Sequence, residues 1–226
     1  MFHSTSTVGI NGSKNMDFVS NNLRGILKKV DAIPNLNELN SYIGKIRRDV
    51  IEEGYTAHLT TAGVIGDVFP DGRETKEILD IAAGTGLVAD ELKKMGFRLI
   101  DALEPSKGML ELAVKKYRNV FNQGLSKDPL PFPSDKYDAI TICGWHGSAG
   151  PLADSLSEMT RVVKPGGYIC IVTRMHYVQN LDDYKETFLP ECIKLEADGK
   201  WKQLEFKGFM GYPFNNEGVK MVFRVC

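Results

Sequence analysis

The chain has 226 residues, of which 42% are hydrophobic and 25% are charged, a balance that suits one globular domain with a full-sized core. Its 28 lysines and arginines nearly equal its 29 aspartates and glutamates, so no large excess of positive charge indicates a nucleic-acid partner. No stretch is long and apolar enough for a bilayer, and residues 1–15 lack the apolar segment of a signal peptide. We therefore expect neither a membrane nor a nucleic-acid partner.

The four cysteines are Cys143, Cys170, Cys192 and Cys226, and no two of them show the spacing of metal ligands. A chain of this size does not need disulfides to hold a core. Cysteine usage therefore predicts reduced thiols in a cytoplasmic protein without a metal site.

The pattern of residues 1–70 predicts a disordered tail followed by helices. A start rich in Ser, Thr, Gly and Asn predicts a disordered tail over residues 1–16. Apolar residues at helical spacing predict three helices, at residues 17–30, 36–53 and 60–68. We expect residues 17–70 to form a helical N-terminal extension or lid, and residues 71–226 to form the core domain.

Beyond residue 76, strands alternate with helices. Short apolar runs predict strands at residues 78–81, 97–103, 120–121, 137–143, 168–173, 201–212 and 219–225. Helical patterns occur at residues 87–95, 106–117, 152–163 and 182–197. Such alternation predicts a parallel sheet covered on both faces, whereas the last two strands, with no helix between them, should pair antiparallel. The predicted fold class is α/β, a doubly wound and mostly parallel seven-stranded sheet with a helical N-terminal extension.

The most informative segment is Ile78-Leu79-Asp80-Ile81-Ala82-Ala83-Gly84-Thr85-Gly86. An apolar strand ends in an acid and small residues, and a helix follows, so backbone N–H groups at the helix start would face a ligand. Gly84, Gly86 and Ala89 also fit the dinucleotide pattern G-x-G-x-x-G/A. Asp80 would attract a ligand ammonium, directly or through water, and would repel a pyrophosphate. The alternative is that Asp80 only caps the turn.

Glu104 ends the second predicted strand, about 20 residues after Gly84. An acid at this place can accept hydrogen bonds from both hydroxyls of a ribose. This feature suits NAD equally well, and the alternative is a solvated loop glutamate.

Four motifs in order resemble the class I S-adenosylmethionine-dependent methyltransferases, and they occupy residues 78–86, 101–110, 130–140 and 163–167. The resemblance covers roughly residues 75 to 175 and implies a seven-stranded Rossmann-like sheet with a reversed final strand and S-adenosyl-L-methionine as cofactor. A closer similarity, carried by residues 84–89, 129–131 and Thr173-Arg174, is to the Williams-Beuren region methyltransferase-like group.

The resemblance also implies which residues hold the cofactor. Its methionine end would lie on Asp80, Ala82, Gly84 and Gly86, and Thr85 is also expected to bind the cofactor. Glu104 would take the ribose, and the adenine would lie between Pro105 and Met109 on one side and Gly124 and Leu125 on the other. Cys143 and Gly144 would border the methyl group.

Three further positions at the carboxyl edge of the sheet are candidates for binding the acceptor or taking a proton from it. His146 could take a proton from the acceptor near neutral pH, or could be a surface histidine. Trp145 could stack on the substrate or contact the sulfonium, or could plug the sheet edge. Arg174, with His176 and Tyr177 near it, could hold a substrate carboxylate or phosphate, or could pair with a surface acid.

Two departures from the family pattern alter these expectations. Many relatives place an acid after the third strand to read the adenine amino group, whereas this chain has Asn122-Gln123-Gly124-Leu125. Many also carry a Tyr-Asp…Trp…Tyr-Asp motif ahead of the core, where this chain has Leu39 and Ile46. An altered lid would suit a cofactor-binding protein that has lost turnover.

The sequence therefore predicts transfer of a methyl group to an oxygen, nitrogen or sulfur atom of a small-molecule acceptor. The alternatives are an NAD(P)-dependent oxidoreductase and a cofactor-binding protein with lost turnover. Asp80 and Pro165-Gly166-Gly167, at their family positions, favour the methyltransferase.

Overall fold

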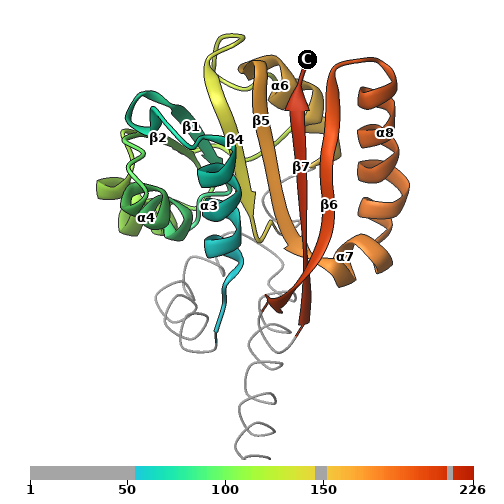
Figure 1. The fold of residues 1–226 in the computed structure, drawn as a ribbon, viewed down its shortest axis with the longest axis horizontal. Helices are drawn as coiled ribbons and strands as arrows, with labels where there is room; N and C mark the ends of the chain where they lie inside the picture. Colours follow the sequence, from blue (N-terminus) through green and yellow to red (C-terminus); the bar gives the residue numbers. More distant parts are fainter. Residues whose placement is uncertain (1–53, 146–151, 213–215) are drawn as a thin grey trace, which may run out of the picture.

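The computed structural model of the chain describes residues 54–145, 152–212 and 216–226, and these residues build one central sheet (Figure 1). The strands are β1 Glu77–Ile81, β2 Leu99–Leu103, β3 Asn119–Phe121, β4 Tyr137–Cys143, β5 Val163–Arg174, β6 Trp201–Tyr212 and β7 Asn216–Val225. They lie in the order β3-β2-β1-β4-β5-β7-β6. Strands β1 to β5 pair in parallel, and β7 runs antiparallel to β5 and β6. The predicted doubly wound, mostly parallel seven-stranded sheet is confirmed.

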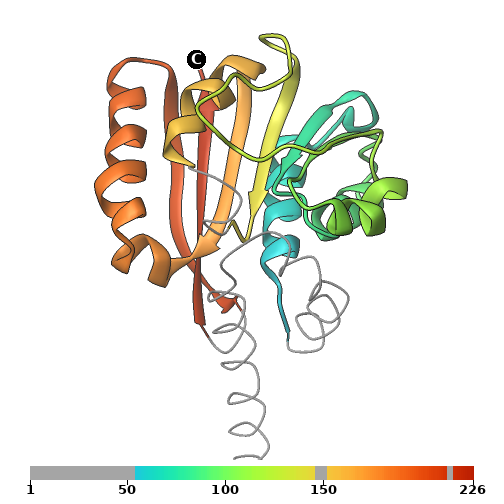
Figure 2. The same cartoon turned by 180° about the vertical axis from the view of Figure 1, so that it is seen from behind.

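Helices cover both faces of the sheet (Figures 1 and 2). The α-helices are α3 Ala57–Val68, α4 Leu87–Lys94, α5 Lys107–Ala113, α6 Leu156–Val162, α7 Met175–Asn180 and α8 Leu189–Ala197. Four further helical segments are the 3-10 turns η1 Arg73–Thr75, η2 Val114–Lys116 and η4 Ala153–Ser155 and the π-helical η5 Asp183–Phe188. One hydrophobic cluster lies under α3, α4 and α5, and a second lies under α6, η5 and α8. Along β1 the side chains alternate between the two clusters, as the pleat of a strand requires.

Helix α3 is packed into the sheet rather than standing apart from it. Ala57, Ala62 and Ile65 are fully buried in the same cluster as β2 and α4 residues. This helix occupies the end of the region predicted as an extension, residues 17–70, and it begins three residues earlier than the predicted helix at residues 60–68. The predicted tail 1–16 and the predicted helices 17–30 and 36–53 lie outside the described residues.

Three local differences from the predicted elements have physical reasons. The segment Pro165-Gly166-Gly167 lies inside β5 as a bulge instead of a turn before it, because Tyr137 pairs with Val163 and Ala139 pairs with Tyr168. Helix α7 was missed, since its six residues bury only Val178 and show no apolar period. The predicted helix 182–197 is divided into η5 and α8, where Pro190 supplies no backbone N–H.

Asp101 is a buried acid of β2 whose negative charge is compensated by neighbouring hydrogen-bond donors. Arg118 donates to both carboxylate oxygens, at 2.9 and 2.7 Å, and Tyr137 and Asn119 donate as well. Burial works to raise the pKa of Asp101, but these donors outweigh it and the pKa lies below its usual value. Asp101 is therefore an ionised member of a satisfied network.

Arg73 ties the end of α3 to the end of α4. Its guanidinium donates to the carbonyls of Phe69 at 2.7 Å, Gly66 at 2.9 Å and Met95 at 3.2 Å. The carbonyls at the end of a helix have no hydrogen-bond donor within that helix. The positive charge of the Arg73 guanidinium also interacts favourably with the negative end of the helix dipole.

Replacing Arg73 by alanine is expected to lower the free energy of unfolding by about 2–4 kcal/mol, because three carbonyls lose a charged donor at once. Urea denaturation measures the change. The matched control is Arg98→Ala, since Arg98 is exposed and donates to the carbonyls of Lys93 and Phe97. Arg98→Ala is expected to lower the free energy of unfolding by less than about 0.5 kcal/mol. Equal losses for the two variants would contradict the helix-joining function of Arg73.

Candidate functional site

A tight turn of small residues joins β1 to α4. Ala82, Gly84 and Gly86 have φ values of 53°, 55° and 78°, in the left-handed region. A Cβ on Gly86 would lie 2.7 Å from Cδ of Lys116 and 3.2 Å from the ring of Tyr117, so both conformation and space require glycine there. Gly86 is also the N-cap of α4, and the turn therefore leads directly into the positive end of a helix.

Asp80 lies at the carboxyl end of β1, below this turn, and is 1% exposed. The Tyr117 hydroxyl donates to its Oδ2 at 2.6 Å, and the Thr141 hydroxyl donates to its Oδ1 at 2.8 Å. Burial raises the pKa of Asp80 to about 6, although both hydroxyls work in the opposite direction. Unlike Asp101, Asp80 takes part in no ion pair within the described parts of the chain. A buried acid whose pKa is raised and that lines a pocket is a candidate functional residue.

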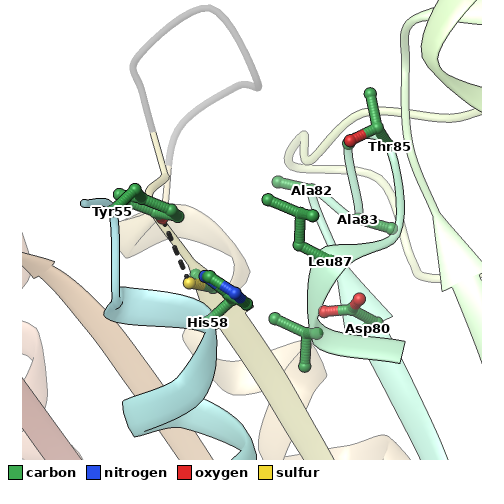
Figure 3. A pocket seen from close by; sticks show the side chains of 10 residues that line it. Tyr55, His58, Asp80, Ala82, Ala83, Thr85 and Leu87 are labelled. Atoms are coloured by element: carbon green, nitrogen blue, oxygen red, sulfur yellow. Dashed lines mark hydrogen bonds between the residues drawn. The ribbon is translucent and has the colours of Figure 1, made fainter. Parts of the chain in front are cut away.

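A pocket opens between the turn and the start of α3 (Figure 3). Its lining consists of Tyr55, His58, Asp80, Ala82, Ala83, Gly84, Thr85, Leu87, Val88 and Cys143. Tyr55 and His58 stand on one wall, and the residues of β1, the turn and α4 stand on the other (Figure 3). Five of the predicted cofactor residues thus share one pocket, and Tyr55 and His58 join them without having been predicted.

Tyr55 and Cys143 meet where β4 ends. The Tyr55 hydroxyl lies 3.3 Å from Sγ of Cys143, and the Tyr55 ring contacts the ring of Tyr212 edge-on at 5.5 Å. A Cβ on Gly144 would lie 2.7 Å from the Tyr55 hydroxyl, so glycine leaves room for it. Burial raises the pKa of Tyr55 well above its usual value and that of Cys143 to about 11. Neither side chain is an anionic nucleophile near neutral pH.

Glu104 connects the glycine turn with the end of β2. Its Oε2 accepts a hydrogen bond from the backbone N–H of Gly84 at 2.9 Å, and its Oε1 accepts one from Ser106 at 2.8 Å. Burial raises the pKa of Glu104, and the two N–H groups only partly offset that effect. Asn122 donates to the carbonyls of Glu104 and Pro105 at 3.0 and 2.7 Å, which ties the end of β3 to the same place.

The remaining predicted cofactor residues surround this edge. Sδ of Met109 lies 3.6 Å from the place of a Cβ on Gly84, so Met109 and the glycine turn adjoin. Pro105 and Gly124 are half-buried. Leu125 is buried in the hydrophobic cluster under α6, which leaves its backbone as the part able to flank a ligand.

The residues predicted to act on the acceptor are not grouped in the same way. Trp145 is buried and packs edge-on against Tyr184 at 5.8 Å, which fits the alternative that it plugs the sheet edge. The Arg174 guanidinium lies over the rings of Tyr177 and Tyr212, at 5.0 and 5.9 Å. His176 is exposed and faces Asn180 at 3.0 Å. The proposed base, His146, lies outside the described residues.

Among the described residues, no group of three or more His, Cys, Asp or Glu side chains is arranged to hold a metal ion. None of the helices in the described ranges is long and apolar enough to cross a membrane.

Comparisons with known proteins agree on one family. Residues 79–171 match a family model described as a methyltransferase domain. Human methyltransferase-like protein 27 is 34% identical over 159 residues, which are 70% of this chain and 64% of the relative. The demethylmenaquinone methyltransferase of Corynebacterium kroppenstedtii is 38% identical over 104 residues, which are 45% of this chain and 43% of the relative. The chain thus spans about two thirds or less of the curated relatives that it matches.

The fold is shared with solved structures. A structure of an S-adenosylmethionine-dependent methyltransferase from Thermotoga maritima superposes with a TM-score of 0.56 at 19% identity, covering 83% of this chain and 98% of that one. Together with the family match, this agrees with the resemblance that the four sequence motifs suggested. Residues 79–171 therefore match a methyltransferase domain in sequence, and the described fold is that of S-adenosylmethionine-dependent methyltransferase structures.

Proposed function

We propose that this protein transfers a methyl group from S-adenosyl-L-methionine to an oxygen, nitrogen or sulfur atom of a small-molecule acceptor. The observation that carries the proposal is Asp80, a buried acid beside the glycine turn that has no cation as a partner among the described residues. A dinucleotide would bring a pyrophosphate to this turn, and the charge of Asp80 would repel it. A cofactor with an ammonium group would instead compensate the negative charge of Asp80.

The residues present fit the other parts of that cofactor. Each Glu104 oxygen already accepts one backbone N–H and keeps lone-pair capacity for a ribose hydroxyl. Gly84 and Gly86 keep side chains away from the turn over which the ligand would lie. When bound, S-adenosylmethionine supplies an electrophilic methyl group on a positively charged sulfur. Neutral Tyr55 and Cys143, at the end of β4, would border that group without competing as nucleophiles.

The acceptor would enter from the side of β5. Arg174 lies over the ring of Tyr212, and a Cβ on Gly144 would lie 3.4 Å from the Tyr212 hydroxyl, so Arg174 and the end of β4 are linked by this tyrosine. A guanidinium held against two aromatic rings suits an acceptor with a carboxylate or phosphate group. Methyl transfer needs alignment and a deprotonated nucleophile, and His146 is the residue that we propose as the base.

Thermal unfolding with S-adenosylhomocysteine, and in parallel with NAD, tests the proposal. A ligand that binds only the folded state raises the free energy of unfolding, by about 2.7 kcal/mol at a hundredfold excess over Kd, and so raises the melting temperature. We expect a shift with S-adenosylhomocysteine alone. A shift with NAD alone would replace the methyltransferase with the oxidoreductase alternative. Cofactor binding without transfer to any member of a broad acceptor panel would favour lost turnover.

A further inference from the structure

Tyr117 is a buried residue that reaches the site without lining its pocket. It follows η2, at the end of the segment that begins with α5. Its hydroxyl donates to Oδ2 of Asp80 at 2.6 Å, and Asp80 lines the pocket from β1 (Figure 3). Burial and the nearby charge of Asp80 raise the pKa of Tyr117 well above its usual value, so the hydroxyl keeps its proton and acts as the donor.

The glycine turn leaves room for this contact and fixes the segment that makes it. A Cβ on Gly86 would lie 3.2 Å from the ring of Tyr117 and 3.4 Å from its hydroxyl oxygen. The preceding residue, Lys116, donates to the Gly86 carbonyl at 3.3 Å and forms an ion pair with Asp90 in the first turn of α4. The place of the Tyr117 hydroxyl is therefore set by packing against the turn and α4 as well as by its bond to Asp80.

The carboxylate of Asp80 is held at both of its oxygens. Thr141 donates to Oδ1 at 2.8 Å from β4, the strand that pairs with β1 on the other side from β2. Two donors from different elements fix the plane of the carboxylate, while each oxygen keeps a lone pair for a further donor. An acid that is already oriented does not have to be ordered when a cationic group binds to it, and this preorganisation favours binding.

We propose that Tyr117 is a positioning residue for the cofactor: its hydroxyl holds the Asp80 carboxylate in the orientation that receives the ammonium group of S-adenosylmethionine. This inference rests on the proposed function, because it takes that cofactor as the ligand. Since Tyr117 does not line the pocket, it acts through Asp80 rather than on the ligand. Removal of the hydroxyl should therefore weaken only those ligands that carry the ammonium group.

Isothermal titration calorimetry at pH 7.5 with two ligands tests the inference. S-adenosylhomocysteine carries the amino-acid end, and 5′-methylthioadenosine lacks it. Tyr117→Phe removes the hydroxyl and keeps the ring beside Gly86. The matched control is Tyr137→Phe, because the Tyr137 hydroxyl donates at 3.1 Å to Asp101, a buried strand acid that does not line the pocket. Thermal unfolding without ligand verifies that each variant is folded.

We expect Tyr117→Phe to bind S-adenosylhomocysteine about three- to tenfold less tightly, the size of one ordinary hydrogen bond, and to bind 5′-methylthioadenosine as the native protein does. Tyr137→Phe should change neither affinity. In a protein that already carries Asp80→Asn, Tyr117→Phe should have no further effect on S-adenosylhomocysteine, because the group through which it acts is gone. Thr141→Val removes the second donor to Asp80 and should follow the same pattern.

The pH profile of binding adds a readout that a merely structural contact would not move. Burial raises the pKa of Asp80, the two bonded hydroxyls oppose this effect, and the charge of Glu104 adds to it. Burial keeps Cys143 and His58, which line the same pocket, uncharged near neutral pH. Without the Tyr117 hydroxyl, the affinity for S-adenosylhomocysteine should therefore begin to fall at a higher pH than the value of about 6 expected for the native protein.

Several results would overturn the inference. Equal weakening of both ligands by Tyr117→Phe would show that Tyr117 only supports the turn. Unchanged affinity for S-adenosylhomocysteine, or an unchanged pH profile, would show that Asp80 needs no positioning. Equal affinity of the native protein for the two ligands would also overturn it, while leaving the proposed function intact. Failure of the native protein to bind S-adenosylhomocysteine at all would instead remove the proposed function, and the inference with it.

Discussion

Replacing Asp80 by asparagine is expected to make the protein without ligand more stable and to weaken its binding of S-adenosylhomocysteine about 10- to 100-fold. The two effects have one cause. In the described part of the chain the carboxylate is buried beside hydroxyl donors and has no cation partner, so its charge costs folding energy that only a bound ammonium would return. Asparagine keeps an oxygen for one hydroxyl, and its amide can donate to the other.

The dependence on pH follows from the raised pKa. Because the pKa of Asp80 rises from 3.8 to about 6 on folding, the folded protein holds this proton more tightly than the unfolded chain does. The resulting stabilisation is complete below pH 3.8 and is lost as the pH rises through 6. At pH 7.5 the asparagine variant should therefore be more stable by about 1–3 kcal/mol, and the gain should vanish near pH 4.

Binding should depend on pH in the opposite direction. The affinity of the native protein for S-adenosylhomocysteine should decrease as the pH falls below about 6, since the protonated acid no longer attracts the ammonium. In Asp80→Asn this dependence should disappear. Calorimetric titrations and melting curves between pH 5 and pH 8 would measure both effects. A variant that is less stable at pH 7.5, or that binds as tightly as the native protein, would contradict this account of Asp80.

Asp101 supplies the matched control, because it is also a buried strand acid but has Arg118 as its partner. Its pKa is lowered, so its contribution to stability is present near neutral pH and is lost on acidification. Asp101→Asn should destabilise the protein by about 2–3 kcal/mol, less than a fully buried ion pair would cost because Arg118 is partly exposed. It should leave binding of S-adenosylhomocysteine unchanged.

The sequence predicted the glycine turn, Asp80 and Cys143 because of a general property of parallel sheets. The carboxyl ends of neighbouring parallel strands meet at one edge, so motifs that follow different strands converge there. Strand pairing then brings Thr141 of β4 level with Asp80 of β1. Thr141 could have been found by aligning the two strands, since it is a polar residue in a buried run.

Other parts of the site had no such signal. Tyr117 follows η2 and reaches Asp80 across 37 positions of the chain, which no periodicity indicates. Tyr55 and His58 could have been marked as two aromatic rings three residues apart, but the sequence did not show that α3 packs beside β4. Tertiary packing, rather than local propensity, decided these positions.

Replacing Glu104 by glutamine is expected to weaken binding of S-adenosylhomocysteine about 100-fold, while the free energy of unfolding changes by less than about 1 kcal/mol. The loss of binding follows from the ribose, whose hydroxyls would lose a charged acceptor. The small effect on stability follows from two opposing changes. Glutamine leaves one of the N–H groups of Gly84 and Ser106 without its acceptor, but it removes a buried charge whose pKa is raised.

A truncated ligand separates ribose binding from a displaced turn. The native protein should prefer 5′-methylthioadenosine over its 2′,3′-dideoxy counterpart, and Glu104→Gln should bind the two alike. The control is Glu158→Gln, since Glu158 also accepts a backbone N–H, from Leu130 at 2.9 Å, but lies away from the pocket. If Glu104→Gln weakened both ligands equally, Glu104 would act by holding Gly84 in place. The acid at the end of β2 would then be a part of the turn, and ribose recognition would have to be sought elsewhere along the sheet edge.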